Sequence, residues 1–392
     1  MNPATPLIVL GASVRAAAWS ARRAGFEVFA ADLFADLDLR RLARTVRVSD
    51  YPAGLETAVE HFPQVPWLYT GGLENHPELV RRIASRRPLL GNGPAVLEMV
   101  RDPFVLANTL DEEGLPGPRV LRHGEAVPGG DWLYKPFRSS GGRGIARAFR
   151  QTVCRSAFRR SSVKPPKGGT TNDAGYYQQW IDGTPCGVLF VAAAGGASFL
   201  GATEQIVLPG SHAAPFWYAG SVGPLALSPA VQFQIDRLGQ ILARRFQLVG
   251  LFGVDVILAA DRVWPIEVNP RYTASVEILE RATGLKAVEV HWAACRDRKL
   301  PASRPQATGM HGKAILYAPR SGIVPQSFTC FADRELEQAL PCLADIPAAG
   351  TPLTAGQPVA TVLAAGDSRA AVLAALEDRL NALQAAVLPA HG

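Results

Sequence analysis

Two acidic side chains and one amide stand in two β-rich runs that are separated by a short turn. Asp255 belongs to the first run, and Glu267 and Asn269 belong to the second. The spacing of the runs is typical of a β-hairpin. If its loop centres on Asp261, Asp255 lies opposite Glu267, and the two-residue period of a strand places Asn269 on the same face. By the same period, the apolar side chains that face the other way into the core are Trp264, Ile266 and Val268.

These three polar side chains could hold a metal ion. Like charges that face each other across a strand ladder destabilise it, and two adjacent carboxylates do not both ionise cheaply. A divalent cation between Asp255 and Glu267 would remove this cost. With the amide oxygen of Asn269 they form an all-oxygen ligand set, which suits Mg²⁺ bound together with phosphates. The alternative is a hairpin whose polar residues face solvent, and the hairpin alone does not decide between the two.

A glycine- and serine-rich stretch lies upstream of the hairpin. Lys135 ends the expected strand 132–136, and Ser139–Gly144 follows it directly. Glycines give the backbone N–H groups freedom to turn toward a phosphate, and the serine hydroxyls add donors. Lys135 is placed to neutralise phosphate oxygens as a point charge. Surface turns use the same residue types, so this stretch indicates a phosphate site only in combination with other features.

The order of these segments resembles that of a known family. A further expected strand, residues 176–181, ends in a turn at Asp182 and Gly183. The order of segments resembles that of the ATP-grasp superfamily: a strand with a lysine, a glycine-rich flap, a strand with glutamines, and a hairpin with carboxylates. The ending Asn269–Arg271 of the hairpin is the most specific part of this resemblance. In that family two lobes clasp ATP and form an acyl phosphate that an amine then attacks.

The resemblance implies a role for each segment. Lys135 would grip the ATP phosphates, and Arg271 would stabilise the charge on the acyl phosphate, so both are expected catalytic residues. Asp255, Glu267 and Asn269 would hold Mg²⁺, with Mn²⁺ as an alternative ion. The residues expected to bind ATP are Lys135, the flap residues Ser139, Ser140, Gly141, Gly142 and Gly144, and the adenine-recognising hinge residues Gln178, Gln179, Trp180 and Ile181. Such chemistry needs positioning and charge neutralisation rather than a covalent protein group.

The sequence departs from the family pattern at three places. Where the family has an Asp-Lys pair at a helix start, this chain has Asp102 and Pro103, so one phosphate-binding lysine is missing. Arg101 could substitute, although a guanidinium is not equivalent to an ammonium. Glutamines occupy the hinge, which leaves the contact to the sugar open. Residues 272–275 replace the glycines that usually follow the Asn-Pro-Arg element, so the substrate cannot be copied from relatives.

The resemblance predicts an ATP-dependent carboxylate-amine ligase that forms an amide bond between a small-molecule carboxylate and a small-molecule amine. A narrower similarity is to the ATP-grasp proteins linked to methanopterin or methylofuran cofactor assembly. One alternative, motivated by Pro103, is a catalytically weakened nucleotide-binding or regulatory module. Another is a nicotinamide-dependent dehydrogenase, but the glycine fingerprint that starts at Gly11 is incomplete. The sequence does not identify the acid or the amine, and the resemblance allows a homodimer without requiring one.

Composition limits the class of protein. The chain has 392 residues, of which 48% are hydrophobic, enough for cores in more than one domain. No apolar run reaches the ~18 residues of a membrane span, and the first residues lack the features of a secretion signal. We therefore expect a cytoplasmic protein without a membrane partner. The five cysteines are scattered without a C-x-x-C pair, so neither a zinc site nor a disulfide framework is expected.

The net charge of +6 could suggest a nucleic-acid partner, but its distribution argues against one. The segment 150–167 contains six basic residues and no acidic residue, so its charge alone equals the net charge of the chain. This segment is expected to be a solvated insertion between flap and hinge. A basic lip over an anionic substrate is the alternative, so its role stays open.

The order of elements indicates a mixed α/β and α+β fold. Strand 6–13, helix 14–23 and strand 26–32 form a βαβ unit with a parallel sheet, so residues 1–93 are expected to form a Rossmann-like domain that precedes the ATP-grasp core. A later strand ends in Glu74 and Asn75. These side chains could face an acceptor substrate or cap the helix that follows.

The remaining chain divides into the core and a C-terminal part. The two-lobed ATP-grasp core is expected over residues 94–300, with the first lobe at 94–177 and the second at 178–300. Within it, helix 228–246 should brace the carboxylate hairpin. Residues 301–392 are expected to form a small β-rich C-terminal domain that ends in an alanine-rich helix.

Overall fold

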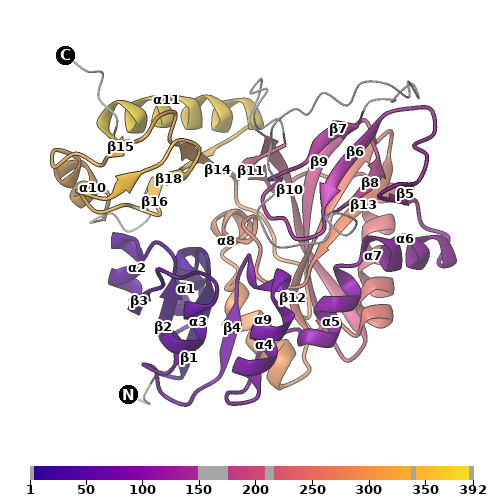
Figure 1. The fold of residues 1–392 in the computed structure, drawn as a ribbon, viewed down its shortest axis with the longest axis horizontal. Coiled ribbons are helices and arrows are strands. Elements are labelled where there is room, and N and C mark those ends of the chain that lie inside the picture. Colours follow the sequence, from indigo (N-terminus) through magenta and orange to yellow (C-terminus); the bar gives the residue numbers. More distant parts are fainter. Residues whose placement is uncertain (1–3, 149–174, 208–215, 337–340, 388–392) are drawn as a thin grey trace.

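The computed structural model describes the chain except residues 1–3, 149–174, 208–215, 337–340 and 388–392. The basic segment 150–167 therefore lies outside the described residues. Figure 1 shows the N-terminal and C-terminal domains on one side of the molecule and the two lobes of the core on the other. The mixed α/β and α+β fold expected from the sequence is confirmed.

The N-terminal domain is built on a four-stranded parallel sheet with the order β3-β2-β1-β4. The predicted βαβ unit is present, and its buried strands are rich in Val, Leu, Ile and Ala, as is typical of strands that are covered on both faces. The elements are β1 (Pro6–Gly11), α1 (Arg15–Arg23), β2 (Glu27–Asp32), α2 (Leu37–Leu42), β3 (Arg44–Arg47), α3 (Gly54–Val59), β4 (Trp67–Tyr69), the 3₁₀ turn η1 (Leu73–Asn75) and α4 (Pro77–Ala84).

The first lobe places Lys135 on a four-stranded antiparallel sheet with the order β5-β8-β6-β7. Helix α6 begins at Pro103, and the Asp102 carboxylate caps it by accepting from Phe104 N at 2.8 Å and Val105 N at 3.3 Å. The elements are α5 (Pro94–Val100), α6 (Pro103–Glu112), β5 (Val120–Arg122), β6 (Trp132–Pro136), β7 (Ala146–Ala148) and β8 (Gly175–Gln179).

An eight-stranded antiparallel sheet joins the second lobe to the C-terminal domain, with the order β13-β12-β9-β10-β11-β14-β18-β16. Helix α7 (Pro229–Phe246), which Ser228 caps, packs its apolar face on this sheet beside the hairpin, as predicted. The other elements of the lobe are β9 (Thr184–Ala193), β10 (Gly196–Val207), β11 (Tyr218–Gly223), β12 (Gly250–Ala259), β13 (Arg262–Asn269), α8 (Val276–Thr283) and α9 (Ala287–Arg296).

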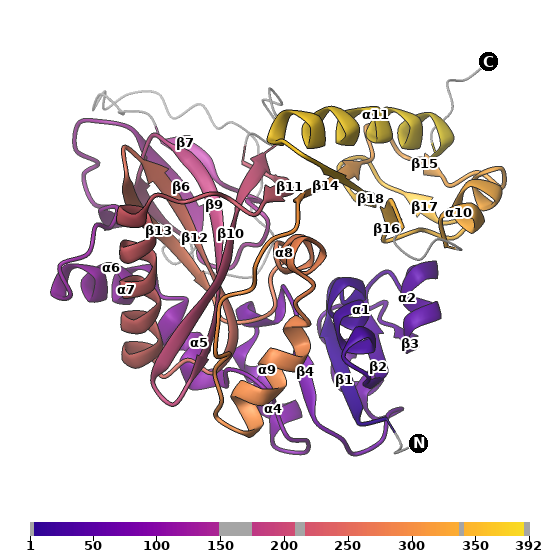
Figure 2. The same ribbon diagram turned by 180° about the vertical axis from the view of Figure 1, so that it is seen from behind.

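The C-terminal domain contributes strands to this sheet and covers them with the long helix α11 (Figure 2). Its elements are β14 (Met310–Tyr317), β15 (Gly322–Ile323), α10 (Phe328–Leu336), β16 (Leu343–Ala344), β17 (Pro352–Leu353), β18 (Pro358–Gly366) and α11 (Arg369–Val387). Among the described helices, none is long and apolar enough to cross a membrane.

The hairpin β12–β13 places Asp255 directly opposite Glu267, as predicted, but by a different route. The turn consists of two residues, Ala260 and Asp261, both with positive φ, which is typical of a type I′ turn. This tighter turn shifts the register by one, and a β-bulge between residues 255 and 256 shifts it back.

The bulge corrects one part of the prediction. Ile266 lines a cavity on the same face as Glu267, and Trp264 pairs with the cavity-lining Ile257. Val268 faces the core as predicted, but the other core-facing residue is Val263, because the extra residue of the bulge reverses the alternation before Glu267.

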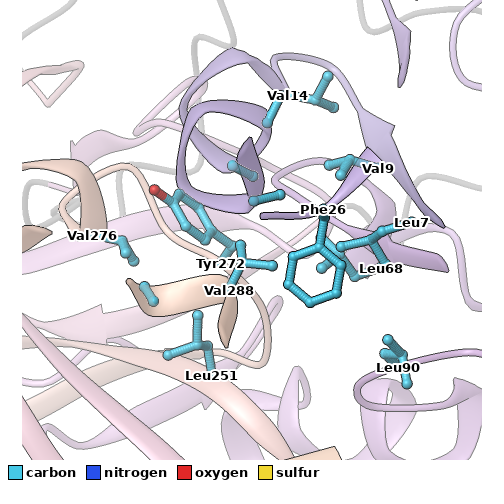
Figure 3. Packing of buried hydrophobic residues seen from close by; sticks show 14 of the residues in the cluster. Leu7, Val9, Val14, Phe26, Leu68, Leu90, Leu251, Tyr272, Val276 and Val288 are labelled. Atoms are coloured by element: carbon cyan, nitrogen blue, oxygen red, sulfur yellow. The ribbon is translucent and has the colours of Figure 1, made fainter. Parts of the chain in front are cut away.

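A shared core packs the N-terminal domain on the second lobe. Apolar side chains from β1, α1 and β2 meet those of β9, β12, α8 and α9. Figure 3 shows Tyr272 and Val276 of the second lobe close to side chains of the N-terminal domain. Phe26 and Trp292 add a tilted aromatic contact with ring centroids 5.0 Å apart. The interface is therefore apolar and close-packed rather than a flexible linkage.

A buried ionic cluster connects all three domains. Glu277 on α8 is fully buried and accepts from Arg15 of the N-terminal domain at 2.5 and 2.8 Å. Lys313 of the C-terminal domain lies 3.4 Å from the same carboxylate. Arg15 also binds Asp345 at 3.1 Å. Burial alone would raise the pKa of Glu277, but the cations around it hold that pKa well below its usual range.

This cluster should matter for stability far more than a surface ion pair. We expect Arg15→Met to lower the free energy of unfolding by about 3–5 kcal/mol, because it leaves a buried carboxylate short of its main partner. The matched control is Arg82→Met, which removes an ion pair with Glu56 at 2.7 Å on the surface and should cost less than about 1 kcal/mol. Urea unfolding measures both, and equal losses would contradict the assignment.

Candidate active site

A cavity of ≈ 540 Å³ lies between the first lobe and the large sheet and extends to the N-terminal and C-terminal domains. Most residues predicted to form the site line this one cavity, although they come from four separate segments of the chain. The predicted residues that line it are Lys135, Ser139, Ser140, Gly141, Gly142, Trp180, Ile181, Asp255, Glu267, Asn269 and Arg271.

Three of the predicted residues do not line the cavity. Gln178 is buried behind it, where its Oε1 accepts from Lys135 Nζ at 3.0 Å and its Nε2 donates to Ile266 O at 3.3 Å. Gln179 accepts from the backbone N–H of Arg119 at 3.3 Å, away from the cavity. Gly144 is exposed, and a Cβ there would lie 2.8 Å from the ring of Pro136. Gln178 thus orients the lysine from behind.

The two opposed carboxylates differ in environment. Asp255 Oδ1 accepts from Gln205 Nε2 at 2.7 Å, and its Oδ2 accepts from Asn269 Nδ2 at 3.1 Å. Burial, followed by the negative charge of Glu267, raises the pKa of Asp255 to about 6. The like-charge cost that the sequence predicts is therefore present on the Asp255 side of the pair.

Glu267 is stabilised in its charged form by two cations. Its carboxylate forms an ion pair with Arg101. Burial alone would raise the pKa of Glu267, but Arg101 and then Lys135 lower it. Burial in turn lowers the pKa of Lys135, against the effect of Glu267 and Asp255. The centre therefore alternates positive and negative side chains, with the Glu267 side chain about one third exposed and that of Arg101 12% exposed.

Arg271 lies on the other side of the carboxylates. Its Nη2 donates to Asn269 Oδ1 at 3.1 Å and to Glu74 Oε1 at 2.6 Å, and its Nε donates to Glu74 at 3.0 Å. Burial tends to lower the pKa of Arg271, but the Glu74 carboxylate raises it above its ordinary value. A guanidinium held in this way is a fixed positive charge beside the carboxylates.

The glycine-rich flap closes one wall of the cavity. The backbone N–H of Tyr218 donates to Gly141 O at 3.1 Å. Gly142 has φ +79°, and a Cβ at that position would lie 1.8 Å from Phe216 O, so only glycine fits this approach. Arg143 stacks on Trp217 with 4.5 Å to the ring centroid. The flap is therefore held against the large sheet, and its residues 139–142 line the cavity.

The two ends of the cavity differ in polarity. Near the flap its walls are apolar and aromatic, with Trp180 and Phe216 in a tilted ring contact at 6.1 Å. This end suits a flat heterocycle. The far end is lined by Ser13 and Arg15 of the N-terminal domain and by Lys313 of β14. Asp255, Glu267 and Arg271 line the same cavity.

Several residues of the site were not in the predicted set. Arg101, Gln205 and Glu74 each contact a predicted site residue directly. Arg101 had a signal in its position beside the missing lysine, and Glu74 had one in its place after a strand of a parallel sheet. Nothing in the sequence indicated Gln205, because a single glutamine in a strand is not part of any motif.

Comparison with known proteins agrees with this geometry. Residues 100–275 match the family described as the ATP-grasp domain. The carbamoyl phosphate synthase large chain of Kocuria rhizophila is 24% identical over 222 residues, which are 52% of this chain and 18% of that protein. The chain therefore spans less than a fifth of that relative. The formate-dependent phosphoribosylglycinamide formyltransferase of Geobacter metallireducens is 24% identical over 299 residues, which are 69% of this chain and 70% of that protein.

Solved structures share the fold over almost the whole chain. An N5-carboxyaminoimidazole ribonucleotide synthetase in complex with ADP superposes with a TM-score of 0.69 at 15% identity and covers 98% of both chains. The L-amino acid ligase of Bacillus licheniformis gives 0.69 at 14% identity and covers 97% of this chain and 98% of its own. At such identities the likeness concerns the fold alone. The family match therefore covers residues 100–275, which resemble an ATP-grasp domain, and the chain as a whole has the fold of these solved structures.

Proposed function

We propose that the protein is an ATP-dependent carboxylate-amine ligase that forms an amide bond through an acyl phosphate. The observation that carries this proposal is the opposition of Asp255 and Glu267 in one cavity with Lys135, Arg271 and the flap. Phosphoryl transfer to a carboxylate needs fixed positive charge around the transferred group rather than a protein nucleophile. The related ligases named above support the reaction class, and their individual substrates are not transferred to this chain.

The hairpin residues fit a divalent cation. Asp255 and Glu267 face each other across the ladder, and their mutual repulsion contributes to the raised pKa of Asp255. Mg²⁺, or Mn²⁺ in its place, would relieve this repulsion and neutralise phosphate charge. Asn269 presents its Nδ2 to Asp255 and its Oδ1 to Arg271. Its amide oxygen has a second lone pair for a ligand role.

The nucleotide would occupy the end of the cavity beside the flap. Trp180, Ile181 and Phe216 give this end the apolar walls that an adenine ring requires. Lys135, held by Gln178, lies between this end and the carboxylates, where the phosphates would pass. Arg101 does not line the cavity and pairs with Glu267, so it does not simply replace the missing lysine of the family pattern.

The acceptor substrate would enter from the opposite end. Arg271 lies beside the hairpin, where it would stabilise the carboxylate that receives the phosphoryl group and the charge on the acyl phosphate. Beyond it, Thr273 and Ser275 offer hydroxyl groups, and Lys313 and Arg15 are tied to Glu277. The domain boundaries at residues 93 and 300, a cytoplasmic location and a homodimer stay predictions alongside this function.

The direct test is ADP release with a panel of carboxylates and amines in the presence of Mg²⁺. A ligase should release ADP in proportion to amide formed, and only when both substrates are present. Tight ATP binding without turnover stimulated by any pair would instead favour the nucleotide-binding module. Mass spectrometry of a co-purified ligand would narrow the panel.

Lys135→Ala should weaken nucleotide binding. The ammonium group would contact phosphates, so we expect the dissociation constant for Mg-ADP to rise about 10- to 100-fold, with little change in melting temperature. The matched control is Lys286→Ala, because Lys286 lies on the surface with Glu289. Calorimetry measures both, and an unchanged dissociation constant for Lys135→Ala would remove this lysine from the site.

Glu267→Gln should separate chemistry from folding. The glutamine keeps the shape but removes a metal-binding charge, so we expect loss of Mg²⁺-dependent turnover while the melting temperature changes by only a few degrees. Glu204→Gln is the control, because Glu204 lies in the same sheet but outside the cavity, where it binds Arg369 at 2.6 Å. Near-normal activity of the Glu267 variant would show that the metal assignment is wrong.

Metal binding should weaken in mild acid. Asp255 must lose its proton to bind a cation, and its folded pKa of about 6 lies above that of a free carboxyl. Affinity should therefore be constant above pH 7 and fall about tenfold per pH unit below 6, while Glu267, whose pKa is lowered, stays ionised. Calorimetry with Mg-ADP from pH 7.5 to 5.5 measures this, and Asp255→Asn reports the nucleotide's own protonation. Identical slopes for both proteins would contradict the prediction.

A further inference from the structure

Two neighbouring residues of the N-terminal domain reach both arginines of the catalytic centre. They are Glu74 and Asn75, on the short turn η1 that follows β4. We propose that Glu74 and Asn75 are positioning residues of the ligase reaction: Glu74 fixes the guanidinium of Arg271, and Asn75 fixes both Arg101 and the flap. This inference rests on the proposed function and assigns the N-terminal domain a part in preparing the site, besides any part in binding the acceptor.

Glu74 is itself held rigidly. Its side chain is 3% exposed, and its Oε2 accepts from the backbone N–H of Gly72 at 2.6 Å. Gly72 has φ +104°, which favours glycine, and a Cβ there would lie 2.4 Å from the hydroxyl of Tyr51. The other oxygen, Oε1, is therefore left to accept both bonds from Arg271. Burial would raise the pKa of Glu74, but Arg271 lowers it, so the carboxylate is ionised at neutral pH.

The bonds of Arg271 define which donor faces the cavity. A guanidinium has five N–H groups. Among the described residues, two of them donate to Glu74, one to Asn269 Oδ1 and one to Tyr272 O. One N–H of Nη1 has no such partner, and Arg271 lines the cavity. The Cζ of Arg271 also lies 3.4 Å from where a Cβ of Gly71 would be, so the backbone before η1 backs the guanidinium. Glu74 thereby leaves one oriented donor for a substrate oxygen.

Asn75 makes the equivalent connection on the other side. Its Oδ1 accepts from Arg101 Nη2 at 3.2 Å, and its Nδ2 donates to Ser139 O at 3.2 Å. Ser139 is the first residue of the flap, and Arg101 is the ion-pair partner of Glu267. Movement of the flap and the orientation of Glu267 are thus connected through one amide.

Helix capping does not explain these two residues. Helix α4 begins after His76, and no side chain caps its N-terminus. The Glu74 side chain lines the cavity instead, and each of the two side chains contacts an arginine. If Glu74 had a purely structural role, its substitution would lower stability alone. If it positions Arg271, its substitution should weaken substrate binding only while Arg271 is present.

A double-mutant cycle tests the Glu74 part. We expect Glu74→Gln to raise KM for the carboxylate about 10- to 100-fold, while the dissociation constant for Mg-ADP stays within about twofold. In the background of Arg271→Gln, the same change should have almost no further effect, because Glu74 acts through Arg271. The control is Glu78→Gln on α4, whose carboxylate pairs with Arg81 on the surface.

The outcomes are distinguishable from failure of the proposed function. If the unaltered protein shows no substrate-dependent ADP release, the proposed function is wrong. If it is active and Glu74→Gln keeps its KM, or loses as much again in the Arg271→Gln background, the positioning role is wrong. Should Glu74→Gln not fold, Glu74→Asp replaces it: the shorter carboxylate keeps the charge but not the two-bond geometry, and an unchanged KM would again overturn the role.

Hydrogen exchange tests the Asn75 part without any substrate. With Mg-ADP present, Asn75→Ala should increase amide exchange in the flap, residues 139–144, severalfold, because the bond to Ser139 O is lost. Exchange in α7, which packs on the large sheet, is the internal reference. Equal flap exchange in both proteins would show that Asn75 does not hold the flap.

Discussion

The site depends on one electrostatic constraint, which is that Asp255 and Glu267 must share one face of a hairpin. Their repulsion is costly, and neighbouring cations offset it on the Glu267 side. Arg101 and Lys135 stabilise Glu267, whereas Asp255 keeps a raised pKa. The surrounding network of Gln178, Gln205 and Asn269 serves mainly to hold these charges at defined distances.

Local patterns predicted the elements well. The βαβ unit, the bracing helix and the opposition of Asp255 and Glu267 follow from periods of 3.6 and 2 residues, and these depend on backbone geometry alone. The bulge at the hairpin could not be predicted from local pattern, because Val263 and Val268 on either side of it pack in one apolar cluster with residues distant in the sequence, including those of α7. The turn is one residue tighter than expected, and the bulge adds one residue. The two shifts of register cancel at Asp255. The correct pairing was therefore reached from an incorrect register, and only Trp264 and Ile266 reveal the difference.

The same limit applies to the site. Residues within a motif, such as the flap serines and Arg271, could be placed by their spacing. Their partners could not, since Glu74 precedes Arg271 by 197 positions and Arg101 precedes Glu267 by 166. Contacts of this kind come from the packing of whole domains. The apolar core shared by the N-terminal domain and the second lobe, and the cluster around Glu277, set those distances. Substrate selection on the far side of Arg271 depends on the same packing.

The continuous sheet from β13 to β16 also has a consequence for dissecting the molecule. Strand β14 supplies the hydrogen-bond partners of β11, so the lobe and the C-terminal domain share one ladder. A fragment truncated near residue 300 would leave β11 as a bare edge, open to strand exchange with other copies. The protein is thus suited to study as an intact chain, and insertions for labelling or fusion belong in surface loops rather than at the apparent junction between its parts.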